Sequence, residues 1–173
     1  MDLKKAIKNI RDFPIEGIVF RDIMTLIADS TAFKQALDEM EKYCRSKKPD
    51  IIVGIESRGF IFGAALADRL GIGFVTVRKV GKLPPPTIKY EYELEYGTDA
   101  IEISDDTIKN GDKVIVVDDL IATGGTLDAT CQLVEKAGGE VVGISAVINL
   151  AYLPWRDKVG DRDVNTLVQY DEE

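Results

Sequence analysis

The chain has 173 residues, of which 45% are hydrophobic and 30% charged, as expected for a globular protein with one hydrophobic core. Its net charge of −8 argues against general binding to nucleic acid, which requires a basic face. It contains no histidine, which excludes Ser-His-Asp and Cys-His catalysis and leaves any metal to oxygen ligands, favouring Mg²⁺ over Zn²⁺.

The N-terminal residues begin an amphipathic pattern and lack the apolar core of a signal peptide. The longest uncharged run of small or apolar residues, 59–67, has nine residues, whereas a membrane span needs about 20. We therefore expect a cytoplasmic protein without a membrane segment. Cys44 and Cys131 fall within helical patterns and are expected to be packed, reduced thiols.

Helical and strand patterns alternate along the chain. Residues 2–12 are predicted to form a short helix, and Ser30 to cap a second helix that continues to about residue 46. Buried strands are predicted at 50–55 and 73–78, with a helix between them at 59–70 that Gly71 ends.

A loop with three consecutive prolines follows and leads into an alternating stretch, 87–95, that is typical of a half-exposed ribbon. The remaining predictions are strands at 113–119 and 140–148, a helix at 124–137 between them, and an edge strand at 167–170. Strands that alternate with helices predict the α/β class, with a mainly parallel sheet flanked by helices in a single domain, 1–173.

The most informative segment is 114–126. Four β-branched residues predict a strand buried on both faces, and Asp118 and Asp119 follow where it ends. Ligands of open α/β sheets bind at the carboxyl ends of strands, and a glycine-rich turn that enters a helix offers backbone N–H groups to a phosphate. Gly124 and Gly125 alone would suit an ordinary turn. The complete segment favours a ligand site, because two adjacent carboxylates repel each other and their presence needs a reason beyond packing.

Three other segments carry charges that packing alone does not explain. Residues 17–23 place Arg21 and Asp22 among apolar residues, and residues 54–60 place Glu56 and Arg58 at the end of a second buried strand. Residues 78–82 contain three cations in an acidic chain. Solvated surface charge is the ordinary interpretation of each cation, but a cluster at a strand end could bind a polyphosphate.

Segment 114–126 closely resembles the phosphoribosyl-pyrophosphate (PRPP) signature of the type I phosphoribosyltransferases. Together with the other three segments and residues 92–97, it appears in the order found in the adenine-specific members, and the resemblance runs from about Ile10 to Leu150. It implies a type I phosphoribosyltransferase fold with a small hood, formed by roughly residues 1–28 and a flexible loop at 79–97. It also implies a homodimer that uses Mg²⁺ to transfer the 5-phosphoribosyl group of PRPP to N9 of adenine.

The same resemblance assigns roles to individual residues. The 5-phosphate would be held by Ala122, Thr123, Gly124, Gly125 and Thr126. The ribose hydroxyls would face Asp118 and Asp119, directly or through the water shell of Mg²⁺, which would have no direct protein ligand. The pyrophosphate would meet Arg58, Lys79 and Lys82, with Arg78 reaching it across the dimer, beside a loop where relatives often have a non-proline cis peptide, here at Ser57.

For adenine, the resemblance implies that backbone groups of Val19 and Arg21 read the base edge while Phe20 and Leu120 sandwich the ring. Glu95 matches the family's proposed acid at adenine N7, although a solvent-facing glutamate is the commoner interpretation of such a residue. Tyr96 would help close the loop and exclude water. Residues 149–156 depart from the pattern Glu-Leu-x-x-Leu-x-Gly-Arg, with Trp155 at the glycine position, which is expected to alter a turn or a dimer surface.

Two alternatives remain open. A phosphoribosyltransferase for another purine base would typically have a base-reading lysine and aromatic residue late in the chain, and no convincing pair is found. A PRPP-sensing regulator without catalysis would be expected to show a DNA-binding appendage or a damaged catalytic loop, and the sequence shows neither.

Overall fold

The structure, a computed structural model, describes residues 1–94 and 96–173. Its strands are β1 (Lys8–Arg11), β2 (Val19–Asp22), β3 (Ile51–Ile55), β4 (Gly73–Lys79), β5 (Thr87–Glu93), β6 (Thr98–Ser104), β7 (Lys113–Ile121), β8 (Glu140–Leu150) and β9 (Val164–Tyr170). Its helices are the 3-10 helix η1 (Leu3–Ala6) and the α-helices α1 (Ile23–Ala28), α2 (Ser30–Lys47), α3 (Gly59–Leu70), α4 (Gly125–Lys136) and α5 (Arg156–Val159).

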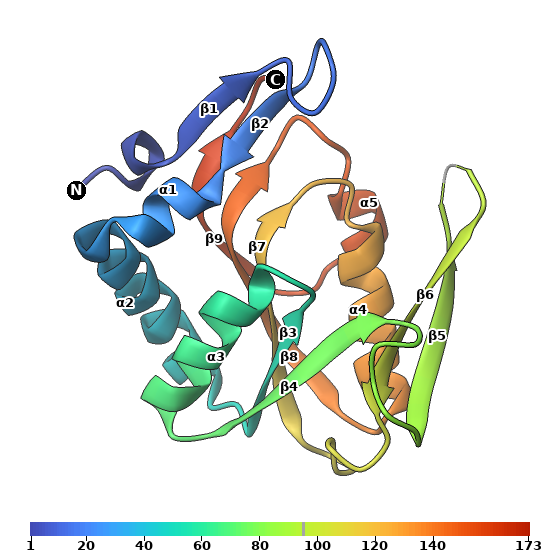
Figure 1. Ribbon diagram of the computed structural model, residues 1–173. Coiled ribbons are helices and arrows are strands. Elements are labelled where there is room, and N and C mark those ends of the chain that lie inside the picture. The colour runs from blue at the N-terminus through green and yellow to red at the C-terminus, as the bar shows by residue number, and fades with distance from the viewer. Residues whose placement is uncertain (95) are drawn as a thin grey trace.

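A seven-stranded sheet with the order β5-β6-β4-β3-β7-β8-β9 forms the centre, with helices on both faces (Figure 1). The strands from β4 to β9 in this order run parallel, whereas β6 is antiparallel to both β4 and β5. The predicted α/β class with a mainly parallel sheet is confirmed. A separate two-stranded hairpin, β1–β2, lies beside the C-terminus (Figure 1).

The central strands are buried on both faces because successive residues point into different cores. Ile52 and Ile115 belong to the cluster that also contains residues of α2 and α3, whereas their neighbours Val53 and Val116 belong to the cluster with residues of α4. Residues 114–117 are fully buried, as predicted for a strand in the middle of a parallel sheet. β3 and β7 are therefore neighbours in the middle of the sheet, and the pocket described below opens at their carboxyl ends.

The cysteine prediction is confirmed, since Cys44 and Cys131 are buried free thiols. Burial raises the pKa of both thiols to about 12, so neither is a ready nucleophile. None of the helices in the described part of the chain has the length and apolar character that crossing a bilayer would require.

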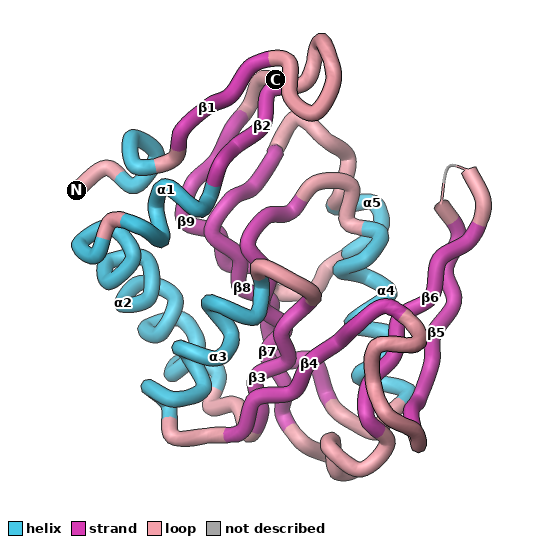
Figure 2. The backbone as a smooth tube through the Cα atoms, in the orientation of Figure 1, coloured by secondary structure: helices cyan, strands magenta, loops and turns pink. Residues whose placement is uncertain are grey.

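Several predicted elements differ from the structure. The helix predicted at 2–12 is wrong beyond η1, because Lys8–Arg11 pairs with Val19–Asp22 and this pairing overrides the helical spacing. The cap of α2 is Asp29, not Ser30, since its carboxylate accepts from the N–H groups of Thr31 and Ala32 at 2.9 and 3.1 Å. Strand β6 was not predicted. It pairs with β5 and forms a two-stranded arm with it in place of the expected single ribbon (Figure 2).

Candidate functional site

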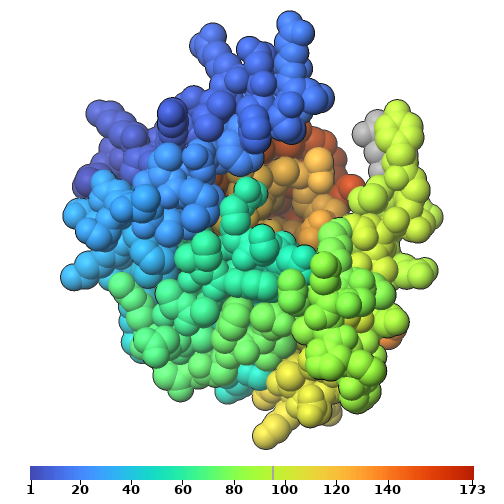
Figure 3. All heavy atoms as spheres, viewed as in Figure 1, coloured from blue at the N-terminus to red at the C-terminus, as the bar shows by residue number. Residues whose placement is uncertain are grey.

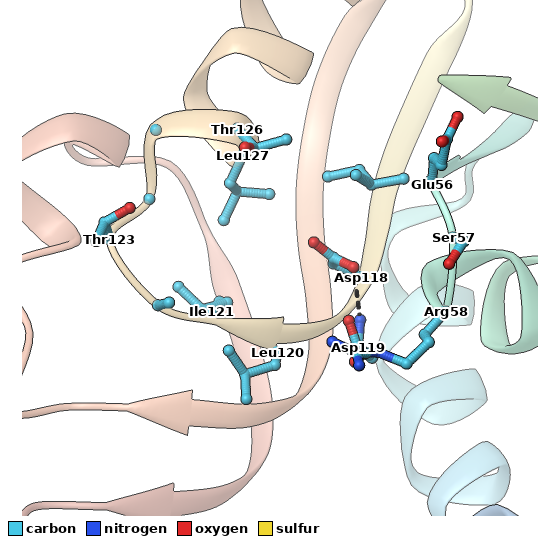
Figure 4. Close-up of a pocket in the computed structure, with 14 residues that line it drawn as sticks. Glu56, Ser57, Arg58, Asp118, Asp119, Leu120, Ile121, Thr123, Thr126 and Leu127 are labelled. Carbon is cyan, nitrogen blue, oxygen red and sulfur yellow. Dashed lines mark hydrogen bonds and ion pairs between the residues drawn. The ribbon is translucent and has the colours of Figure 1, made fainter. Parts of the chain in front are cut away.

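A pocket of about 430 Å³ opens at the carboxyl ends of β3 and β7. It is lined by residues 55–58, at the end of β3 and directly after it, and by residues 118–127, at the end of β7 and the start of α4. Figure 4 shows the two segments facing each other, with Arg58 pointing toward Asp119. On the molecular surface, a hollow lies between the N-terminal hairpin, in blue, and the β5–β6 arm, in yellow-green (Figure 3). The location agrees with the general rule for ligands of α/β sheets.

The turn after β7 has a backbone that requires glycine at one position. Gly124 has φ +83°, and a Cβ there would lie 2.8 Å from the carbonyl oxygen of Trp155. Helix α4 starts at the next residue, and no side chain caps its first N–H groups. These groups carry the positive end of the helix dipole into the pocket, where they can bind an anion.

The paired aspartates form the floor of the pocket, and their environments differ. Asp119 is 6% exposed and accepts a hydrogen bond from Nε of Arg58 at 2.7 Å. Burial, followed by the negative charge of Asp119, raises the pKa of Asp118 well above its ordinary value. Gly59 at the start of α3 lets that helix approach closely, since a Cβ there would lie 3.0 Å from Oδ1 of Asp118. Among the described residues, the ion pair of Arg58 involves Asp119 and not Asp118, which leaves the second carboxyl group available to a cation or to sugar hydroxyls.

Three of the four predicted pyrophosphate-binding cations are paired with carboxylates. Besides the Arg58–Asp119 pair, Nε of Arg78 donates to Glu56 at 2.8 Å, and Lys79 pairs with Asp99. Lys82 is exposed on the loop between β4 and β5. Arg58 lines the pocket, whereas Arg78, Lys79 and Lys82 lie outside its lining. Because the paired cations are one-third to one-half exposed, a ligand with stronger negative charge can compete for them.

Glu102 organises the loop that carries Lys82, and the sequence analysis missed it. Its buried carboxylate accepts hydrogen bonds from the N–H groups of Gly81 and Leu83 and from the hydroxyl of Thr87, at 3.0, 3.1 and 3.1 Å. Burial opposes ionisation, but these donors outweigh it and lower the pKa of Glu102. The residue lies in β6, the unpredicted strand, so no sequence signal marked it.

The β5–β6 arm touches the turn after β7. The hydroxyl of Tyr92 lies 3.2 Å from Oγ1 of Thr126 and 3.3 Å from Oδ2 of Asp99, the carboxylate that pairs with Lys79. Tyr96, near the tip of the arm, is 87% exposed and lies away from the pocket lining. Glu95, the predicted acid, lies outside the described residues. Tyr92 thus connects the start of α4 to Asp99 and, through that carboxylate, to Lys79.

The residues predicted to bind adenine come from two places. Leu120 lines the pocket, whereas Val19, Phe20 and Arg21 lie in the hairpin outside its lining. The ring of Phe20 faces the guanidinium of Arg58, with 5.9 Å between the guanidinium carbon and the ring centroid. The hairpin therefore meets the pocket through Phe20 and Arg58, at the rim.

Two expectations for the surrounding loops have definite outcomes. The non-proline cis peptide is present at Glu56-Ser57. Trp155 is not at the surface, since it is 6% exposed behind the turn at Gly124, and its indole N–H donates to Oδ1 of Asn149 at 2.7 Å. Asn149 and Trp155 occupy the glutamate and glycine positions of the pattern seen in relatives, so the two departures from that pattern contact each other.

The comparisons with known proteins agree with one another. A family model described as the phosphoribosyl transferase domain matches residues 25–166. The adenine phosphoribosyltransferase of Clostridium botulinum (strain Eklund 17B / Type B) is 54% identical over 171 residues, covering 99% of both chains.

Solved structures give the same result. The crystal structure of adenine phosphoribosyltransferase from Thermoanaerobacter pseudethanolicus ATCC 33223 is 47% identical, has a TM-score of 0.93 and covers 97% of this chain and 98% of that one. The protein from Saccharomyces cerevisiae, complexed with D-2,5-dideoxy-2,5-imino-altritol 1,6-bisphosphate and adenine, is 42% identical with a TM-score of 0.90 and covers 96% of each chain. The similarity extends over nearly the whole chain.

Proposed function

Because the chain belongs to the phosphoribosyl transferase family, we propose that it is a purine-salvage enzyme that converts adenine and PRPP to AMP and pyrophosphate. One observation carries the proposal: the uncapped glycine turn follows the paired aspartates at the edge of the sheet where ligands bind. Full-length relatives named as adenine phosphoribosyltransferases favour adenine over the other purine bases and an active transferase over a silent regulator.

The 5-phosphate of PRPP would occupy the turn at residues 122–126. Backbone N–H groups at the start of α4, together with the hydroxyls of Thr123 and Thr126, would donate to its oxygens. The absence of a side-chain cap on α4 and the positive φ of Gly124 support this assignment, because both leave the backbone open to a close anion.

We further propose Mg²⁺ as the cofactor. The arrangement of the two aspartates supports a cation here, because Arg58 pairs with Asp119 and no ion pair of Asp118 is found among the described residues. Asp118 and Asp119 would hold the ion through its water shell and would also face the ribose hydroxyls. When bound with PRPP, the ion neutralises charge on the departing pyrophosphate.

The cations at the rim would act on the leaving group. Displacement at a ribosyl carbon has an oxocarbenium-like transition state, in which negative charge grows on the pyrophosphate. Arg58, Lys79 and Lys82 would stabilise that charge more in the transition state than in the ground state. The partly exposed side chains of Arg58 and Lys79 support this role, since both can exchange one anion for another.

Adenine would lie between the hairpin and Leu120, with its edge read by the backbone of Val19 and Arg21 and its face covered by Phe20. The contact between Phe20 and Arg58 supports a base next to the pyrophosphate site. Because the chain has no histidine, a carboxyl group would exchange the proton at adenine N7, and Glu95 remains the predicted residue. Tyr96 would help exclude water.

The domain, assembly and location of the protein also belong to the proposal. Residues 1–28 and the loop 79–97 would together form the hood over the pocket. The chain would act as a homodimer, with Arg78 reaching the partner's pyrophosphate site, and in the cytoplasm. Light scattering of the purified protein tests the assembly, with twice the chain mass of 19.1 kDa as the expected result.

The proposed activity can be tested directly. The purified chain is incubated with PRPP and Mg²⁺ and, separately, with adenine, hypoxanthine, guanine or xanthine, and the nucleotide and pyrophosphate formed are measured. We expect AMP from adenine, loss of turnover when the divalent ion is chelated, and its return when Mg²⁺ is added back. Turnover with hypoxanthine and none with adenine would reject the proposed specificity.

A further inference from the structure

The hairpin β1–β2 is outside the main sheet. It continues into α1, where the hydroxyl of Thr25 accepts a hydrogen bond from the N–H of Lys8 at 3.0 Å, so side-chain contacts decide how the rest of the hairpin lies over the pocket. β2 pairs only with β1 among the described strands. Among the hydrogen bonds, ion pairs and ring contacts of the described residues, those that join the hairpin to the pocket lining or to the C-terminal residues are made by Phe20 and Arg21. Arg21 therefore attaches the hairpin to the C-terminal residues.

The Arg21 side chain extends to the C-terminal end of the chain. Its guanidinium carbon lies 4.1 Å from the ring centroid of Tyr170, and its Nη2 donates to the carbonyl oxygen of Glu172 at 3.4 Å. The ammonium of Lys4 lies 4.4 Å from the same centroid and donates to the carbonyl oxygen of Gln169 at 2.8 Å. A single aromatic ring thus receives two cations from the N-terminal segment.

The ring of Tyr170, and not its hydroxyl, makes these contacts. Tyr170 is 5% exposed, and its hydroxyl has no hydrogen-bond partner in the described part of the chain. Burial raises the pKa of Tyr170, so the ring is a neutral phenol that attracts cations through its π-face. Nε of Arg21 is likewise buried without a partner among the described residues, so the side chain is held by the ring of Tyr170 and by the hydrogen bond to Glu172.

We propose that Tyr170 is a positioning residue for recognition of the base: its ring holds Arg21, and thereby β2, in the position over the pocket where the strand's backbone would contact adenine. This inference rests on the proposed function, because it assigns the backbone of Val19 and Arg21 to the base. The turn that would bind PRPP is built instead on β7 and α4. Loss of the ring should therefore weaken adenine binding selectively.

The test compares two substitutions at one position. Tyr170→Leu removes the ring and should raise KM for adenine about tenfold, as expected for loss of a buried cation–ring contact. Tyr170→Phe keeps the ring and loses only an unpartnered hydroxyl, so its KM for adenine should stay close to that of the wild type. Both variants should keep KM for PRPP within about twofold of the wild type, which corresponds to less than half a kcal/mol.

A substitution at the other residue of the contact covers the case in which Tyr170→Leu does not fold. Arg21→Met removes the cation from the other side of the contact and should raise KM for adenine with KM for PRPP unchanged. Equal increases in both KM values, an unchanged KM for adenine in Tyr170→Leu and Arg21→Met, or a Tyr170→Phe variant as impaired as Tyr170→Leu would overturn the inference. Failure of the wild-type chain to form AMP from adenine would reject the proposed function instead.

Discussion

The two sides of the pocket are built in different ways. The side assigned to PRPP consists of the ends of β3 and β7, in the middle of a sheet packed on both faces. The side assigned to adenine is a two-stranded hairpin at the periphery; among the described residues, Phe20 and Arg21 make its ring contacts with the pocket lining and the C-terminal residues. The first arrangement would hold a phosphate through backbone geometry, whereas the second would place the base through a few side-chain contacts.

The largest expected effect on activity comes from a substitution at Gly124, on the side assigned to PRPP. Gly124→Ala places a Cβ 2.8 Å from the carbonyl oxygen of Trp155 at a positive φ, so the turn must move. A shift of this turn should lower kcat/KM for PRPP more than about a hundredfold, measured by steady-state kinetics.

The neighbouring glycine provides a matched control for stability. A Cβ at Gly125 would lie 3.5 Å from Nζ of Lys158, an ordinary contact, and Gly125 does not have a positive φ. Gly125→Ala should therefore keep a thermal midpoint near that of the wild type, while Gly124→Ala lowers it. Equal midpoints for the two variants would contradict the steric account of Gly124.

The next effect concerns the loop that joins the PRPP side to the arm. Glu102→Leu leaves the N–H groups of Gly81 and Leu83 without an acceptor and should disorder the loop that carries Lys82. KM for PRPP should rise about tenfold with KM for adenine unchanged, since hydrogen bonds to a charged acceptor contribute about 1.5–3 kcal/mol each. Glu102→Gln retains an acceptor oxygen and should show a smaller increase. An unchanged KM for PRPP in Glu102→Leu would disprove this organising role.

A substitution on the hairpin should give the opposite selectivity. Phe20→Leu removes the ring that faces Arg58 and would cover adenine. KM for adenine should rise about fivefold, a typical value for loss of an aromatic contact, while KM for PRPP changes little. If Phe20→Leu raised KM for PRPP more than KM for adenine, the division of the pocket into two sides would not hold.

The smallest effect is a pH dependence of stability that comes from Asp118. Its pKa is higher in the folded than in the unfolded chain, so its contribution to stability is complete at low pH and is lost as pH rises from the ordinary carboxyl range near 4 through the raised value. Asp118→Asn cannot ionise and should have a higher thermal midpoint than the wild type at pH 8. At pH 4 the difference should become smaller. A difference independent of pH would show that ionisation of Asp118 does not destabilise the folded chain.

The contrast between the two sides also explains what the sequence could predict. The PRPP side is encoded by contiguous residues: four β-branched residues, two acids and a glycine turn give the strand, its end and the helix start in one segment. Helix α3 and its left-handed cap at Gly71 are likewise encoded by contiguous residues, and the predicted bounds match the observed ones.

Features that depend on distant contacts could not be predicted. β1 is a strand because it pairs with β2, and Arg21 is held by Tyr170 and Glu172, the latter 151 residues away. Glu102 has a role only because β6 returns beside β4 and places its carboxylate under the loop. Trp155 is expected to alter a turn or a dimer surface, and it does pack behind the turn at Gly124, but no local pattern encodes which turn it meets.

A crystal structure of the chain with AMP tests the central claim most directly. The account predicts that the phosphate accepts hydrogen bonds from the N–H groups of residues 122–126, with the ribose over Asp118 and Asp119 and the base between Phe20 and Leu120. A phosphate bound elsewhere, with the turn at Gly124 and Gly125 making no contact with the nucleotide, would contradict it.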